Sequence, residues 1–158
     1  MWLKNISLVI VSLFLVTGCV TSGKPTMTPL EIQTLQSKEY EAEEAIVFRS
    51  VVSVFQDLGY TISNADVASG LISAESSTDS SVAFQIFTGS TKTNQTRATG
   101  VVEQIGSKTK VRLNFVSVNQ TSSGWGQTNR KDEPITDAKV YENAFEKIGS
   151  AIFLRQNS

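Results

Sequence analysis

Few side chains in this sequence could do covalent chemistry. Cys19 is the only cysteine among 158 residues, and the chain contains no histidine. The sequence therefore excludes a Ser-His-Asp or Cys-His catalytic set, a histidine-ligated zinc or haem, and an intramolecular disulfide. No serine lies in a G-x-S-x-G motif, in which a strained turn exposes a nucleophilic hydroxyl. The thiol of Cys19 is the group whose surroundings indicate a specific reaction.

Residues 1–18 have the layout of an export signal. Lys4 is the only charged residue before Lys24, and Ile6–Val16 is apolar except for Ser7 and Ser12. A basic start followed by an apolar run of this length is typical of a secretory signal peptide. Since a membrane-spanning helix needs about 20 apolar residues, we expect removal of this segment rather than permanent insertion.

The apolar run ends in Val16-Thr17-Gly18-Cys19, which resembles the lipobox of bacterial lipoproteins. The resemblance implies that a diacylglycerol is attached to the thiol of Cys19, that the signal peptide is cut between Gly18 and Cys19, and that the new amine is acylated. Two or three chains would anchor the protein stably, because one chain binds only marginally. The resemblance also implies that Val20 favours outer-membrane sorting where the source has an outer membrane, because in enteric-type bacteria an Asp at this position marks retention in the inner membrane. The alternative is an unmodified cysteine inside an ordinary signal peptide.

The segment that follows Cys19 differs from the remainder of the chain. Residues 19–29 are rich in Thr, Ser, Gly and Pro and have no apolar period, which predicts a lipidated cysteine followed by a flexible tether. Residues 30–158 are long enough to bury one core and predict a single domain. The net charge of −1 provides no basic surface for nucleic acid, and we expect neither a cofactor nor a metal.

Two amphipathic helices are expected in this domain. The first spans residues 43–58, and the second runs from a cap at Asp137 to about Leu154. Each has one wide apolar stripe, which must be covered by another element. We expect both stripes to lie on the same face of a sheet, with four residues in the shared core: Phe48, Phe55, Phe145 and Ile148.

Alternating and β-branched residues indicate the strands. Strands are expected at residues 30–40, 60–63, 70–76, 97–105 and 108–119, with a turn at 64–66 and a long polar loop or frayed strand end at 120–133. The apolar segment Val82–Phe87 fits either a strand or a short helix. The predicted fold is α+β, a two-layer sandwich in which an antiparallel β-sheet carries two amphipathic helices on one face.

Four stretches of the domain carry a family resemblance: residues 56–62, 70–74, 109–115 and 140–148. They resemble a group of small uncharacterised bacterial outer-membrane lipoproteins. The architecture is also similar to the helix-grip domains of a lipoprotein component of the outer-membrane barrel assembly machine, a likeness of fold alone. Neither resemblance implies any catalytic residue.

Glu39, Glu41, Glu43 and Glu44 form an acidic cluster that could bind a divalent cation or act as an acid/base pair. We favour a solvated strand end and helix N-terminus, where exposed acidic residues are normal.

Trp125 lies between Gly124 and Gly126 in a polar segment. Tryptophan is frequent at protein-binding hot spots and at membrane interfaces, which makes it a possible interaction residue. The alternative, which we favour from sequence, is that the ring folds back over the sheet edge as a lid on the core.

Three functions fit these features. The first is a non-enzymatic, lipid-anchored periplasmic protein that binds a partner in an envelope complex. The second is a binding module for a small apolar ligand or lipid held between sheet and helix. The third is a wall hydrolase, which would need two inward-facing carboxylates in a cleft. We rank them in this order, because the anchor and the missing catalytic set favour the first.

Overall fold

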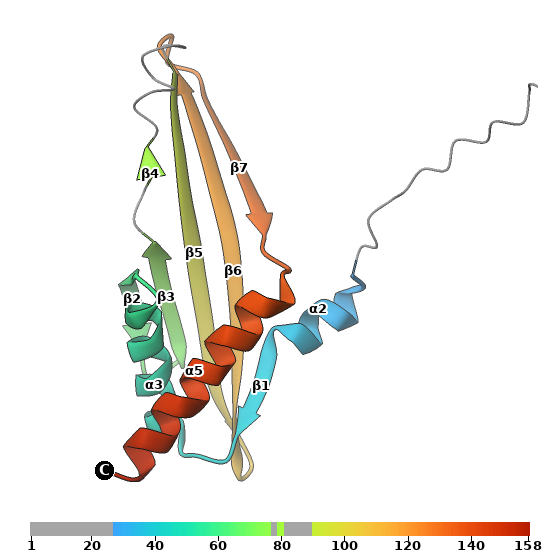
Figure 1. The fold of residues 1–158 in the computed structure, drawn as a ribbon, viewed down its shortest axis with the longest axis vertical. Helices are drawn as coiled ribbons and strands as arrows, with labels where there is room; N and C mark the ends of the chain where they lie inside the picture. Colours follow the sequence, from blue (N-terminus) through green and yellow to red (C-terminus); the bar gives the residue numbers. More distant parts are fainter. Residues whose placement is uncertain (1–26, 77–78, 81–89) are drawn as a thin grey trace, which may run out of the picture.

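The computed structural model of the chain describes residues 27–76, 79–80 and 90–158. The signal peptide, Cys19 and most of the tether lie outside these residues, and so does the segment Val82–Phe87. The described part is an antiparallel sheet with two long helices against one face (Figure 1). This arrangement confirms the predicted α+β two-layer sandwich.

The elements have the following bounds: α2 Pro29–Leu35, β1 Ser37–Tyr40, α3 Glu44–Asp57, β2 Tyr60–Asp66, β3 Leu71–Ser76, β4 Asp79–Ser80, β5 Ser90–Ile105, β6 Lys108–Ser123, β7 Thr128–Pro134 and α5 Ala138–Gln156. In the sheet the order is β1-β6-β5-β3-β2, with β4 beside β5 and β7 beside β6. Strands β1 and β7 thus flank different halves of β6.

The hairpin of β5 and β6 forms the centre of the sheet. It closes at Gly106, whose φ of 62° suits a tight turn, and its pairing runs unbroken from there to the pair Ser90 and Ser123. This confirms the predicted hairpin and lengthens both strands. The end of the ribbon opposite to the turn at Gly106 extends past the helices, with β7 alongside (Figure 1).

Helices α3 and α5 cover the other half of this ribbon (Figure 1). The carboxylate of Asp137 accepts a hydrogen bond from the backbone N–H of Lys139 at 3.0 Å, which satisfies an unpaired donor at the start of α5. Helix α3 ends before Gly59, which has a φ of 84°. Both helices therefore begin and end close to the predicted positions.

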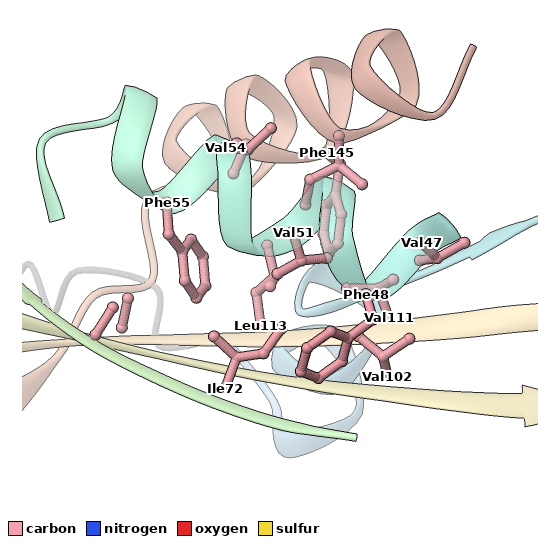
Figure 2. Packing of buried hydrophobic residues seen from close by; sticks show 14 of the residues in the cluster. Val47, Phe48, Val51, Val54, Phe55, Ile72, Val102, Val111, Leu113 and Phe145 are labelled. Carbon is pink, nitrogen blue, oxygen red and sulfur yellow. The ribbon is translucent and has the colours of Figure 1, made fainter. Parts of the chain in front are cut away.

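The core lies between these helices and the sheet. Phe48, Phe55, Phe145 and Ile148 are at most 5% exposed, as predicted. Figure 2 shows Phe48, Val51 and Phe55 of α3 on the side of the helix that faces residues of β3, β5 and β6, including Leu113. An aromatic group extends the core along the sheet: the ring centroids of Phe55, Tyr60, Phe115 and Tyr141 lie 5.3–6.2 Å from their neighbours.

The prediction of a strand over residues 30–40 was wrong for its first part. Thr28 begins a helix instead: its hydroxyl accepts from the backbone N–H of Glu31, and the Glu31 carboxylate accepts from the backbone N–H of Thr28 at 2.7 Å. This capping box, with Pro29 in the first turn, favours helix over strand. Only β1 is extended.

The predicted turn at residues 64–66 was also wrong, because β2 continues to Asp66. The turn comes directly afterwards and ends at Gly70. Asp66 stabilises it by accepting from the hydroxyl of Ser69 at 2.7 Å and the backbone N–H of Ala68 at 3.1 Å. These two bonds lower the pKa of the Asp66 carboxyl.

The segment 120–133 is not a loop. It contains the end of β6, a turn and most of β7. Alternate residues of β7 share a face, so its charges pair along the strand: Arg130 with Asp132 at 2.8 Å and Lys131 with Glu133 at 2.6 Å. A charged strand of this kind discourages pairing with other chains.

Candidate functional site

The predicted lipidation site precedes the described residues. Cys19, the predicted lipid carrier, and Gly18, on the other side of the predicted cleavage site, lie outside them, and the described helix α2 begins about ten residues after Cys19. The capping bonds from Thr28 lower the pKa of the Glu31 carboxyl. The fold thus starts at a well-formed helix end a short distance after the predicted anchor.

The point where α2 joins the sheet is fixed by hydrogen bonds. The backbone carbonyl of Gln36 accepts from the backbone N–H of Leu113 at 2.8 Å. The side-chain amide of Gln36 donates to the phenolic oxygen of Tyr141 at 3.4 Å, and the Tyr141 hydroxyl donates to the carbonyl of Ile135 at 2.8 Å. The chain therefore enters the domain at the level where β7 ends and α5 begins.

Trp125 is 97% exposed, so the lid interpretation was wrong. It lies in the turn between β6 and β7, at the end of the β5–β6 ribbon opposite to the turn at Gly106 (Figure 1). The backbone N–H of Ser123 donates to the carbonyl of Gln127 at 2.8 Å, and the N–H of Gly126 donates to the carbonyl of Ser123 at 3.1 Å. The hairpin presents the indole at its tip, away from the core.

A second exposed apolar surface was missed from the sequence. Phe153 and Leu154 on α5 are 65% and 66% exposed. They border a shallow depression that is also lined by Phe145, Glu146, Gly149 and Ser150 of the same helix and by Lys38 of β1. We call the exposed pair Phe153 and Leu154 the α5 patch. Phe153 directly follows the buried Ile152, so the sequence pattern alone does not separate it from the buried stripe.

The acidic cluster spans the end of β1 and the start of α3. Glu41 lies 3.8 Å from the ammonium group of Lys108, and Glu43 precedes α3 without a side-chain capping bond. Within the described ranges, no group of three or more His, Cys, Asp or Glu residues could hold a metal ion. The arrangement supports the solvated interpretation of these side chains.

The interface between sheet and helices is filled by side chains. Phe55, Leu113, Val51 and Tyr141 are 0% exposed there, and the ring of Phe115 contacts its aromatic neighbours. The depressions beside β1 and along α5 open onto the surface. This packing does not favour an apolar ligand held between sheet and helix.

No family model and no curated protein matches the chain. Among the residues whose placement is described, none of the helices combines the length and the apolar character needed to cross a membrane.

Proposed function

We propose that this protein is a lipid-anchored lipoprotein of the bacterial envelope, cut between Gly18 and Cys19 and acylated at Cys19, with its domain in the periplasm. The observation that carries the proposal is the position of Cys19. The only cysteine of the chain follows an apolar run of signal-peptide length and precedes the first described helix by about ten residues. Where the source has an outer membrane, Val20 favours that membrane as the destination.

The anchored domain acts by binding an envelope protein rather than by catalysis. The absence of histidine, which excludes histidine-dependent catalytic sets, supports a non-enzymatic role. The α5 patch supplies a binding surface, because Phe153 and Leu154 are both exposed and border the same depression. Aromatic side chains supply much of the contact energy at protein interfaces, where they are buried against apolar groups.

Site-specific photo-crosslinking in intact cells tests this role. A benzoylphenylalanine placed at Phe153 should give a discrete protein adduct. The matched control places the same probe at Val67, which is 61% exposed in the turn between β2 and β3, outside the α5 patch. Adducts from both positions alike, or from neither in correctly anchored protein, would contradict protein binding through α5.

A further inference from the structure

We propose that the turn carrying Trp125 docks into the lipid–water interface of the membrane that holds Cys19, so that the domain attaches at two points. This inference rests on the proposed lipid anchor. Its first support is exposure: the indole of Trp125 is 97% exposed. Tryptophan has an apolar ring and a single N–H donor, a combination that suits the boundary between acyl chains and headgroups.

The composition of the tip fits a membrane rather than a charged protein surface. No charged residue occurs from Leu113 to Asn129, so the tip can approach lipid without burying a charge. Gly124 and Gly126 flank the ring and leave it unobstructed. Protein-binding hot spots normally have a surrounding rim of side chains that excludes water, and these glycines provide none.

Backbone groups of the turn already have hydrogen-bond partners, which suits a less aqueous environment. The N–H groups of Ser123 and Gly126 already donate within the turn, at 2.8 Å and 3.1 Å. The hydroxyl of Ser123 donates to the carbonyl of Gln127 at 3.3 Å. Backbone groups that enter a membrane interface without partners are costly, and these bonds reduce that cost.

A paired ribbon holds the tip at a distance from the helices. Thr121, near the end of β6, pairs with Lys92 on one side and with Asn129 on the other. From Phe115 to Ser123 the strand advances about 26 Å, at about 3.3 Å per residue. The ring is therefore carried well beyond the helical layer, on a support that cannot fold back as a loose loop could.

The tether is long enough to bring both attachment points to one membrane. Gln36 and Tyr141 fix the start of the domain near Ile135, at the end of β7. From there to the tip, β7 covers about 20 Å. Helix α2 separates Thr28 from Gln36 by about 10 Å, and a fully extended chain from Cys19 to Thr28 reaches about 30 Å. A membrane that contains the acyl chains on Cys19 can therefore also meet Trp125.

Intrinsic fluorescence measures this contact directly. Trp2 and Trp125 are the only tryptophans in the chain, and cleavage before Cys19 removes Trp2. The purified lipidated protein is reconstituted in phosphatidylethanolamine and phosphatidylglycerol vesicles, with and without brominated acyl chains. We expect a blue shift relative to an unlipidated mature chain carrying Cys19→Ser, and a loss of intensity with brominated lipid.

The matched control carries Trp125→Phe together with Val67→Trp, which moves the fluorophore to the turn between β2 and β3. This lipidated double variant should float with vesicles but show neither the blue shift nor the quenching. If the wild-type protein floats with vesicles while Trp125 keeps the emission of the Cys19→Ser chain, the docking is refuted and the anchor stands. If the wild-type protein fails to float, the anchor is refuted, and the docking with it.

Discussion

Replacing Gly70 by alanine should strongly destabilise the domain, because the turn between β2 and β3 lies against β5. Gly70 has a φ of 66°, and a Cβ added there would lie 1.9 Å from the carbonyl oxygen of Val102. The carbonyl of Gly70 also accepts from the backbone N–H of Val102 at 2.9 Å. Gly59 offers a matched control, since its φ is 84° and an added Cβ would meet nothing within 4 Å.

Both substitutions place a Cβ on a residue with left-handed backbone geometry, which costs about 1–2 kcal/mol in stability. In Gly70→Ala the strand must also move away from Val102, which is 2% exposed, and a buried N–H left without a partner costs about 1–3 kcal/mol more. We therefore expect Gly70→Ala to lower the free energy of unfolding by about 2–5 kcal/mol. Gly59→Ala should lower it only by the cost of the left-handed backbone. Urea unfolding followed by circular dichroism measures both free energies. Equal midpoints for the two variants would show that the turn does not approach β5.

Further predictions concern the core and the cofactors. Phe55→Ala and Phe145→Ala, at buried positions, should each cost about 3–5 kcal/mol in the free energy of unfolding, whereas the exposed Lys147→Ala should change it little; unchanged midpoints for both phenylalanine variants would place those rings in solvent. Tyr141→Phe removes the donor to the carbonyl of Ile135 and should cost about 1–3 kcal/mol, so an unaltered urea midpoint would contradict the role of this hydroxyl. The mature chain should unfold at the same temperature with chelator or with reductant, and a large loss of thermal stability under either would reveal a metal or disulfide.

The long periodic elements were predictable because their patterns match a single structure. Helix α5 has a capping aspartate at Asp137 and an apolar residue every three or four positions. The β5–β6 hairpin has a tight turn at Gly106 and alternating residues up to Phe115. In both cases local preference and core burial favour the same conformation, so the sequence was sufficient.

Helix α2 was missed because its signal is short and polar. It buries no residue and so lacks the apolar stripe used to recognise helices. Its evidence is the capping box of Thr28 and Glu31, which was available in the sequence. The strand β7 was missed for another reason: its residues are exposed, so only pairing with β6 defines it.

The position of Trp125 also depended on that pairing. A glycine-flanked tryptophan in a loop could fold onto the sheet edge, and this was the favoured interpretation. Because β7 pairs with β6 from Ser122 to Val116, the residues between the strands form a turn at the ribbon tip. The ring therefore points away from the core, an outcome set by contacts between segments rather than by local sequence.

The chemistry at Cys19 is the central claim, and intact mass spectrometry of the membrane-extracted protein tests it most directly. We expect a mature chain that begins at Cys19 and carries a diacylglyceryl group with a further acyl chain. A palmitate analogue should label the wild-type protein, while Cys19→Ala should lose the label and leave the membrane fraction. A mature chain that begins elsewhere, or a Cys19→Ala variant that still takes up the label, would contradict the account.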